Sequence, residues 1–200
     1  MTRLPEGCVS PGALVTDPDI AASYAVDESF GATAPGDFTL VRATELSDVV
    51  EVMREAQARG IPVVPQGART SVAGGAIATQ GCIVLNVEAL TGIDIDEVES
   101  HADVGPGVVN TDLKAAAAQV GLFYPPDPAS ADISTIGGNV ATNAGGLCCI
   151  KYGVTADYVK ALQVVLPGGE VIRTGHRTAK GVAGYDLTGL FVEPSGPLAV

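Results

Sequence analysis

The segment IPVVPQGARTSVAGGA, residues 61–76, joins a short apolar run to a loop of small residues that contains three glycines. The run at residues 61–64 predicts a strand, and the loop begins where that strand should end. Gly67, Gly74 and Gly75 allow backbone conformations and close approaches that a Cβ atom would forbid. The loop is therefore either a plain turn or a concave row of backbone amides that holds an anion such as phosphate. It matches neither G-x-x-x-x-G-K-S/T nor G-x-G-x-x-G, so the common nucleotide motifs do not choose between the two.

The elements on either side of this loop have mixed α and β character. Before it, apolar residues recur at helical spacing, with a Thr or Ser available as N-cap and Gly60 as the C-terminal stop; they are Leu46, Val49, Val50, Met53 and Ala56. After it, residues 82–87 are typical of a second strand. The order of helix, strand, glycine loop and strand indicates a mixed α/β domain.

The rest of the chain adds short elements. Residues 1–34 are expected to form an extended lead-in, rich in Pro, Gly and Asp, with a short helical piece around residues 20–25. Asn110, Thr111 and Asp112 are expected to cap an alanine-rich helix that Gly121 closes. The remaining predictions are that helix at residues 113–120, short strands at 93–95 and 100–104, and a hairpin of 161–166 with 170–173.

Two further loops are as unusual as the first. The prolines of YPPDPAS, residues 124–130, remove backbone donors and restrain their neighbours, so this segment is predicted to be a rigid loop. Directly after it, TIGGNVATNAGG, residues 135–146, carries two Gly-Gly pairs eight residues apart, with Thr142 and Asn143 between them. A single large ligand that contacts all three loops would explain why one short chain contains three loops of such unusual composition. A dinucleotide, with its pyrophosphate and extended polar chain, needs bare backbone at several points.

The composition limits the partners that the chain can bind. Its 200 residues are 46% hydrophobic, which suffices for one good core, and 11 Lys and Arg face 23 Asp and Glu for a net charge of −12. This charge repels nucleic acid and anionic lipid at long range. An anionic ligand must therefore be held by local backbone dipoles and not by the field of the whole protein.

The targeting and cysteine patterns are typical of a cytoplasmic protein. The first 20 residues lack the basic region and apolar stretch of a secretory signal. The uncharged run at residues 133–150 contains four glycines and two asparagines, which argues against a membrane span. The four cysteines form no C-x-x-C pair and the chain has two histidines, so neither a zinc site nor a disulfide framework is predicted. Cys148 and Cys149 are expected to be small buried thiols in a reducing compartment.

Five motifs together carry a resemblance to a known family. In order they are VVPQGARTSVAGGA, YPPDPASADISTIGGNVATNAGG, KYGVTADYV, LPGGEVIRTG and GYDLTGLFV. Their order and spacing resemble the FAD-binding domain of the vanillyl-alcohol oxidase and p-cresol methylhydroxylase superfamily. Within it they are most similar to the branch of D-lactate dehydrogenase, the glycolate oxidase flavin subunit and D-2-hydroxyglutarate dehydrogenase. The resemblance implies an α+β fold, a two-lobed FAD-binding domain of the p-cresol methylhydroxylase type at residues 35–200, with the substrate domain absent and the lead-in at residues 1–34.

The resemblance also implies which residues contact FAD. They form a pyrophosphate loop, a second contact segment, and a third segment near the ribityl chain and the isoalloxazine. Their residues are, for the first, Pro65, Gln66, Gly67, Ala68, Arg69, Thr70, Ser71, Gly74 and Gly75; for the second, Pro128, Ala129, Ser130 and Ser134; and for the third, Gly137, Gly138, Ala141, Thr142, Asn143, Ala144 and Gly145.

The residues of the pyrophosphate loop indicate whether FAD is attached covalently. Covalently flavinylated relatives often attach the flavin through a histidine in or just after the first loop. Here Ala68, Arg69 and Thr70 stand at that place, so the resemblance implies non-covalent, dissociable FAD. Arg69 either adds a charge-assisted contact to phosphate or is a solvated loop arginine.

Other polar residues have less specific roles. Lys151 and Tyr152 either line the edge of the cavity or take part in simple packing. Tyr185 and Asp186 are expected to be structural. The two histidines, His101 and His176, are expected to be solvated surface residues.

The end of the sequence departs from the family's pattern. The family closes its flavin domain with GSEGTLGV, whereas residues 193–200 are EPSGPLAV and keep only a glycine, the leucine and the valine in register. In the family this segment lies against the flavin. A substrate domain then follows, and it brings the arginine for the substrate carboxylate, the histidine base and any metal site. The resemblance therefore implies no catalytic and no metal-ligating residue in this chain.

The activity implied by the resemblance is oxidation of a small D-2-hydroxy acid, of the lactate, glycolate or 2-hydroxyglutarate type, by hydride transfer to flavin N5. Two alternatives stay open: a truncated FAD-binding module without turnover, and the flavin subunit of a multi-subunit dehydrogenase. If the chain is part of an enzyme, the 2-hydroxy acid is expected to bind through a missing domain or a second subunit. Neither nucleic acid nor a membrane span is expected as a partner.

Overall fold

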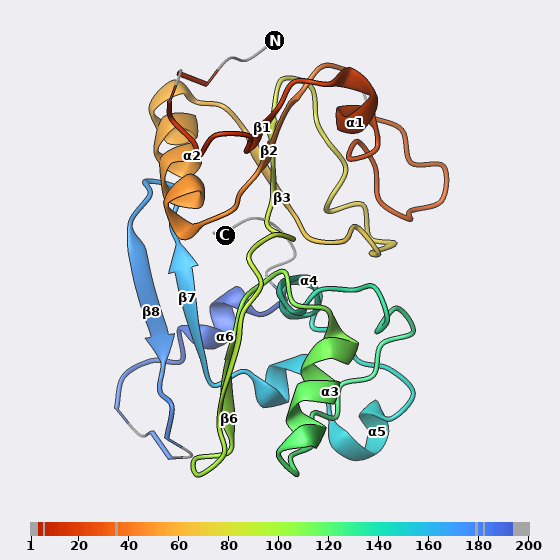
Figure 1. Cartoon of the computed structure of the whole chain (residues 1–200), viewed down its shortest axis with the longest axis vertical. Coiled ribbons are helices and arrows are strands. Elements are labelled where there is room, and N and C mark those ends of the chain that lie inside the picture. Colours follow the sequence, from red (N-terminus) through yellow and green to blue (C-terminus); the bar gives the residue numbers. More distant parts are fainter. Residues whose placement is uncertain (1–3, 6, 35, 179, 182, 194–200) are drawn as a thin grey trace.

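The chain forms two lobes that a β-hairpin connects, as the computed structural model in Figure 1 shows. The structure describes residues 4–5, 7–34, 36–178, 180–181 and 183–193. The first lobe contains β1 (Leu14–Val15), α1 (Pro18–Ala22), β2 (Thr39–Arg42), α2 (Leu46–Arg59), β3 (Val63–Gln66) and β4 (Ile83–Asn86). The second contains β5 (Ile93–Asp96), β6 (His101–Val104), α3 (Asn110–Gln119), α4 (Ile136–Ala141), α5 (Cys149–Tyr152) and the 3₁₀ turn η1 (Thr155–Tyr158). The hairpin β7 (Ala161–Val165) and β8 (Val171–Gly175) and the short α6 (Thr188–Phe191) complete the chain.

The sheet of the first lobe has the strand order β1-β2-β4-β3. The three strands β2, β4 and β3 are parallel, and β1 pairs with β2 in the antiparallel direction. In the register of β3 and β4, Gln66 lies opposite Asn86. The loops that leave these two strands therefore start side by side at one edge of the sheet.

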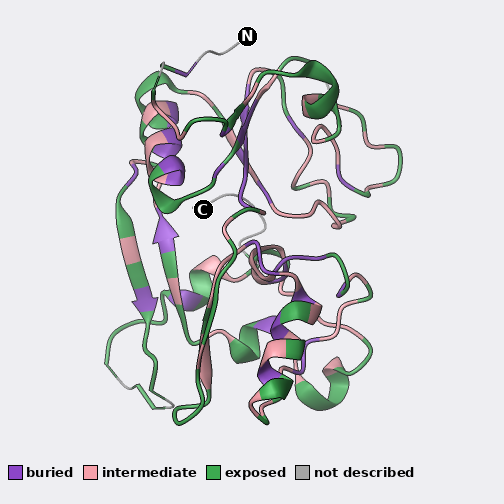
Figure 2. Ribbon diagram, in the orientation of Figure 1, coloured by how far each residue is buried: buried purple, intermediate pink, exposed green. Residues whose placement is uncertain are grey.

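Alternation along the strands gives the sheet two buried faces. Val41, Ile83 and Leu85 pack on the apolar stripe of α2, where Val49, Val52, Met53 and Ala56 are buried. Leu40, Val64 and Val84 point the other way, and the N-terminal segment covers them with Val15, Ala21, Tyr24, Ala34 and Phe38. Figure 2 shows the buried stripes on the sheet and on α2. Residues 14–38 thus act as the second layer on the sheet of the first lobe.

Helix α2 begins in a network around a single carboxylate. Asp48, which is 2% exposed, accepts hydrogen bonds from the backbone of Ser10, Thr44 and Glu45 and from the Thr44 hydroxyl. The N-cap residue is Glu45, not the Thr or Ser that the sequence predicts, because Thr44 binds Asp48 from one residue outside the helix. Gly60 ends the helix in the left-handed conformation, as predicted.

Strand β3 continues two residues further than the predicted strand at 61–64 and includes Pro65. A proline inside a strand is tolerated at the edge of a sheet, where its missing N–H would face solvent. Because β3 is the last strand in the order, Pro65 removes no hydrogen bond of the β3–β4 ladder. Strands β1 and β2 were not predicted, since their short runs carry little alternation.

The β7–β8 hairpin contacts both lobes. Val165 is 2% exposed and belongs to the core beneath α2, while the Arg177 guanidinium pairs with Asp103 in β6. Gly169 turns the hairpin with φ of 84°, and a Cβ there would lie 3.0 Å from the Val50 carbonyl of α2. Close packing and a left-handed turn therefore both require glycine at this position.

Candidate functional site

The loop that follows β3 leaves a row of backbone amides without partners. Within the described part of the chain, the N–H groups of residues 67–72 have no hydrogen-bond acceptor. Arg69 lies in the left-handed region with φ of 59°, and its immediate neighbours do not. An alternation of this kind curls the backbone so that successive amides can face one concave side. The loop can therefore bind an anion without any basic side chain.

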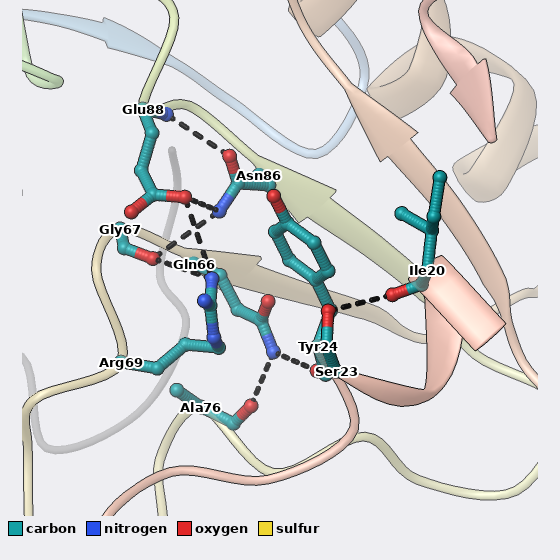
Figure 3. Close-up of polar contacts among 9 residues, drawn as sticks. All are labelled: Ile20, Ser23, Tyr24, Gln66, Gly67, Arg69, Ala76, Asn86 and Glu88. Carbon is teal, nitrogen blue, oxygen red and sulfur yellow. Dashed lines mark hydrogen bonds and ion pairs between the residues drawn. The ribbon is translucent and has the colours of Figure 1, made fainter.

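Two buried side chains hold the loop at its start (Figure 3). The Gln66 amide nitrogen donates to the Tyr24 carbonyl at 2.8 Å and to the Ala76 carbonyl at 2.6 Å, which ties the far end of the loop to its beginning. The Asn86 amide nitrogen donates to the Gly67 carbonyl at 3.2 Å. Because Gln66 and Asn86 face each other across β3 and β4, both act where the loop leaves the sheet.

Arg69 is held on two sides. Its guanidinium lies 4.1 Å from the centre of the Tyr24 ring, a cation–π contact, and 3.4 Å from the Glu88 carboxylate. A third contact, also at 3.4 Å, runs to the Gly67 carbonyl. The side chain is 20% exposed, so the prediction of a solvated loop arginine is wrong. A direct contact of Arg69 with phosphate stays a prediction.

The three unusual loops lie against one another. A Cβ atom at Gly67 would clash with the Thr135 hydroxyl, so the first glycine loop touches the start of the second. Asp127 of the proline loop forms an isolated bridge with Gly146, where a Cβ would clash with the Asp127 carbonyl. Gly67 and Gly146 are thus positions where neighbouring backbone requires the absence of a side chain. The two ends of residues 135–146 each meet one of the other loops.

Residues 136–141 form helix α4, not the loop that the glycines of TIGGNVATNAGG predict. Thr135 caps the helix by accepting from the Gly138 amide at 3.3 Å. Gly137 is needed for space, since a Cβ there would lie 2.8 Å from the Pro106 side chain. The amides of Gly137 and Gly138 bond to the Pro106 carbonyl and to Thr135. These two amides therefore have hydrogen-bond partners, whereas the amides of residues 67–72 have none in the described structure.

The second predicted contact segment is anchored by a buried polar network. The Asn110 side-chain Nδ2 donates to Asn139 Oδ1 at 2.8 Å, and Asn139 Nδ2 donates to the Ser134 hydroxyl at 3.1 Å. All three residues are at most 3% exposed. Helix α3 begins at Asn110 itself, three residues before the prediction, because this side chain bonds to Asn139 and does not cap α3. Pro128, Ala129 and Ser130 form a turn that is partly open to solvent.

The third predicted segment contains a residue, Asn143, that ties three parts of the chain together. Asn143 has φ of 45°, donates to the Glu193 carboxylate at 3.1 Å and accepts from the Ala156 amide at 2.9 Å. Ala141 and Thr142 are exposed, while Ala144 and Gly145 are half-buried. Glu193 is the only described residue of the closing motif; residues 194–200, with both prolines, lie outside the described residues.

A cavity of about 570 Å³ opens beside the contact between Gly67 and Thr135. Glu88 and Asp112 stand at its wall together with Val108, Ile133 and Thr135. Two carboxylates disfavour a diphosphate inside the cavity. The row of amides at residues 67–72 is therefore the better place for phosphate, and the cavity suits a neutral or cationic group.

Several residues outside the loops differ from expectation. Cys148 is exposed and Cys149 half-buried, so the prediction of buried thiols is wrong for this pair. His176 is exposed as predicted, whereas His101 is partly buried and its Nδ1 atom has no partner among the described residues. The antiparallel pairing of β5 and β6 sets His101 opposite Asp96.

The remaining predicted residues lie away from the glycine loops. The Tyr152 ring meets Phe123 edge to face at 5.8 Å, which favours packing over a cavity role, and Lys151 is exposed. Asp186 accepts from the Gly189 amide at the start of α6, a structural role as predicted. Tyr185 is 96% exposed, so its side chain has no packing role in the described structure.

The described residues also limit what else the site can hold. Among them, no group of three or more His, Cys, Asp and Glu side chains is placed to bind a metal ion. No described helix has the length and apolar character required to cross a bilayer.

The two-lobed α+β fold, with a glycine-rich loop where the lobes meet, is the architecture of a domain that binds a nucleotide cofactor. Solved structures share this fold. The chain superposes on 6-hydroxy-D-nicotine oxidase from Arthrobacter nicotinovorans with a TM-score of 0.72 and 23% identity, over 86% of this chain and 38% of that one. It superposes on alkyldihydroxyacetonephosphate synthase with a TM-score of 0.79 and 21% identity, over 96% of this chain and 36% of that one.

The chain belongs to the family of FAD-binding domains, whose model matches residues 39–175. FAD is therefore its cofactor. Curated relatives include the glycolate oxidase subunit GlcD of Bacillus subtilis, which is 48% identical over 78% of this chain and 33% of its own length. They also include a D-lactate dehydrogenase of Archaeoglobus fulgidus, 38% identical over 89% of this chain and 41% of its own length. A D-2-hydroxyglutarate dehydrogenase of Stutzerimonas stutzeri is 36% identical over 95% of this chain and 41% of its own length. The chain thus spans between a third and two fifths of these relatives.

Proposed function

We propose that this chain is the FAD-binding part of an oxidoreductase that oxidises a small D-2-hydroxy acid to the 2-keto acid. The observation that carries the proposal is the row of unpartnered amides at residues 67–72, in a described chain that belongs to the family of FAD-binding domains. The names of the relatives above, which contain glycolate, D-lactate and D-2-hydroxyglutarate, support this substrate class. The loop also contacts the second lobe, through Gly67 and Thr135.

The part played by the chain's own residues is to bind and orient the cofactor. Residues 65–71, with Gly74 and Gly75, bind the diphosphate through backbone amides. Residues 128–134 form the second segment that contacts FAD. Residues 137–145 form the third, near the ribityl chain and the isoalloxazine. When bound, FAD supplies the N5 atom that accepts a hydride. Binding of the substrate carboxylate and removal of the hydroxyl proton are assigned to a part of the protein outside this sequence.

The cofactor is proposed to be bound non-covalently. No histidine is present in residues 65–76, where covalently flavinylated relatives attach the flavin. The location is proposed to be cytoplasmic, because all four cysteines are free thiols, as is usual in a reducing compartment.

A comparison of two flavins tests the proposal. The purified chain is titrated with FAD and with riboflavin, and binding is followed by quenching of flavin fluorescence. FAD is expected to bind at least about 100-fold more tightly, because each phosphate gains charge-assisted hydrogen bonds worth about 1.5–3 kcal/mol. Acid is expected to release the flavin unchanged. Equal affinity for the two flavins would contradict the role of the amide row.

Two alternatives predict different behaviour. A binding module without turnover holds FAD but is never reduced, whatever protein accompanies it. A flavin subunit of a larger dehydrogenase purifies from its source with a second chain, and the complex bleaches its flavin on anaerobic addition of a D-2-hydroxy acid. Bleaching by this chain alone would contradict the assignment of proton removal to another part of the protein.

A further inference from the structure

The N-terminal segment contacts the amide row although it lies outside the family match at residues 39–175. The Glu28 amide donates to the Ser71 carbonyl at 3.1 Å, and the Ala78 amide donates to the Ala25 carbonyl at 2.9 Å. The Tyr24 carbonyl accepts from the Gln66 side chain at 2.8 Å. Residues 24–28 are therefore bonded to the loop at its start, its middle and its end.

The same segment supplies the ring that faces Arg69. Side chains with a Cβ atom are disfavoured in the left-handed region, and Arg69 has φ of 59° there. The Tyr24 ring at 4.1 Å and the Glu88 carboxylate at 3.4 Å contact its guanidinium from two directions, as Figure 3 shows. With Arg69 in this conformation, its guanidinium makes both contacts at once. They can therefore compensate for the unfavourable backbone conformation.

The guanidinium also balances a charge beside the loop. The Glu88 carboxylate accepts from Asn86 at 3.0 Å, and Asn86 in turn bonds to the Gly67 carbonyl at 3.2 Å. Without Arg69 as its counter-ion, Glu88 would place a negative charge close to the amides that are to receive a diphosphate.

We propose that Tyr24 is a positioning residue for the cofactor: with Glu88 it fixes Arg69 in the left-handed conformation and so shapes the amide row of residues 67–72. The identity of the ligand rests on the proposed function, whereas the shaping of the loop does not. Arg69 acts through its place in the loop and through its pairing with Glu88, and not as a direct phosphate ligand. The N-terminal segment is then part of the cofactor-binding unit and not a separate lead-in.

A double-mutant cycle tests the proposal. The variants are Tyr24→Leu, Arg69→Gly and the double variant, and FAD affinity is measured by fluorescence quenching. Tyr24→Leu is expected to weaken binding roughly 3- to 30-fold, the range that a cation–π contact supports. In the Arg69→Gly background the same change is expected to have less than about a twofold effect, because glycine takes the left-handed conformation without support. Tyr24→Phe keeps the ring and is expected to restore affinity.

The exposed Tyr185 provides the matched control, since Tyr185→Leu removes the same side chain at a site that is 96% exposed. An equal loss for Tyr24→Leu in both backgrounds would mean that the ring acts by general packing, and would overturn the proposal. A tenfold or greater loss of FAD affinity on Arg69→Gly that persists when Glu88→Gln removes the unpaired carboxylate would make Arg69 a direct ligand and overturn it too.

A measurement on the ligand-free protein separates this proposal from the proposed function. In two-dimensional nuclear magnetic resonance spectra, Tyr24→Leu is expected to shift the amide signals of residues 67–72 and to abolish the ring-current shift of the Arg69 side chain. Signals from α3 and α5 in the second lobe, away from Tyr24, should stay in place. If the unmodified chain binds no FAD, the proposed function fails. The spectra of the ligand-free protein still test whether Tyr24 shapes the loop at residues 67–72. Unchanged signals at residues 67–72 would refute that role.

Discussion

Single glycines in this protein serve two different needs, which the sequence alone does not separate. Gly74 has φ of 79° and is needed for its backbone conformation, whereas Gly67 is needed because Thr135 occupies the space that a Cβ would fill. Only the first need is local to the chain. The second depends on which residue, 68 positions further along, the fold brings into contact with Gly67.

Replacement of Gly67 tests the contact between the two glycine segments. Gly67→Ala is expected to destabilise the protein by about 1–3 kcal/mol, because the added methyl group overlaps the Thr135 hydroxyl. FAD affinity should fall as well, and both values can be measured by denaturant unfolding and flavin titration. Gly92→Ala is the control, since Gly92 has open space around its Cβ position. In a Thr135→Ala background, which already lacks the α4 cap, Gly67→Ala should cost much less than in the unmodified protein if the overlap is the cause, and an equal cost in both backgrounds would contradict it.

Tyr124 allows a prediction about alkaline pH. Burial raises its pKa from 10.0 to about 12, against a hydrogen bond with Thr155 that lowers it. Because the folded pKa lies above the unfolded one, the neutral phenol stabilises the fold fully below pH 10, and this contribution is lost as the pH rises toward about 12. Absorbance at the phenolate band should show a titration step near pH 12. Tyr124→Phe should remove that step, and its persistence would exclude Tyr124.

At the scale of elements, the start of α2 provides the clearest energetic test. Asp48 accepts four hydrogen bonds, so Asp48→Ala leaves donors of Ser10, Thr44 and Glu45 without partners and is expected to cost about 2–4 kcal/mol. Thermal and denaturant unfolding would measure this. Glu51→Ala is the control, because its pair with Arg54 is solvent-exposed and should contribute less than about 1 kcal/mol. Similar losses in both variants would count against the network.

The same carboxylate predicts sensitivity to acid. Burial acts to raise the pKa of Asp48, but the hydrogen bonds from Ser10 and Thr44 outweigh it and hold the pKa below its ordinary value of 3.8. A folded pKa below the unfolded one gives stability that is present above pH 3.8 and is lost as the pH falls through the lowered folded value. Unfolding free energies measured between pH 6 and 2 should therefore fall less steeply for Asp48→Asn. Parallel curves would contradict the prediction.

Helices and strands whose sequence pattern lies within the element itself are predicted well, and those that depend on distant partners are not. Helix α2 and strand β4 carry long apolar patterns, and both were predicted almost to the residue. The two glycines of α4 are poor helix formers and predict a loop, yet Thr135 caps the helix and Pro106 packs against Gly137. The start of α3 was misplaced because Asn110 bonds to a residue of α4. Partners distant in sequence decided both cases.

At the scale of the whole molecule, net charge and local backbone act in opposite directions on FAD. The net charge of −12 repels a doubly charged diphosphate at long range, while in the proposed binding mode the amide row attracts it at short range. The association rate constant of FAD is therefore expected to rise as salt increases from about 10 to 150 mM, where the Debye length shrinks from about 30 to 8 Å. Stopped-flow fluorescence would measure it, with uncharged riboflavin as the control. A rate that falls with salt would show that a positive local field dominates.

The three bare or rigid loops of the candidate site could be identified from the sequence, and the structure shows contacts between them at Gly67 with Thr135 and at Asp127 with Gly146. That they bind FAD stays a prediction. The support behind the first loop could not be identified from the sequence. Tyr24 lies in a segment without periodicity, and its contact with Arg69 depends on how residues 14–38 cover the sheet. No spacing rule connects a tyrosine with an arginine 45 positions later.

The β7–β8 hairpin has a consequence for how the protein forms during synthesis. Val165 fills the core under α2, although every other buried member of that cluster lies before residue 88. A ribosome-bound chain that has released only the first lobe therefore exposes an apolar gap beside α2 until the hairpin emerges. Nascent chains arrested before residue 161 should accordingly be cleaved readily by protease, and chains arrested well beyond residue 175 should resist it.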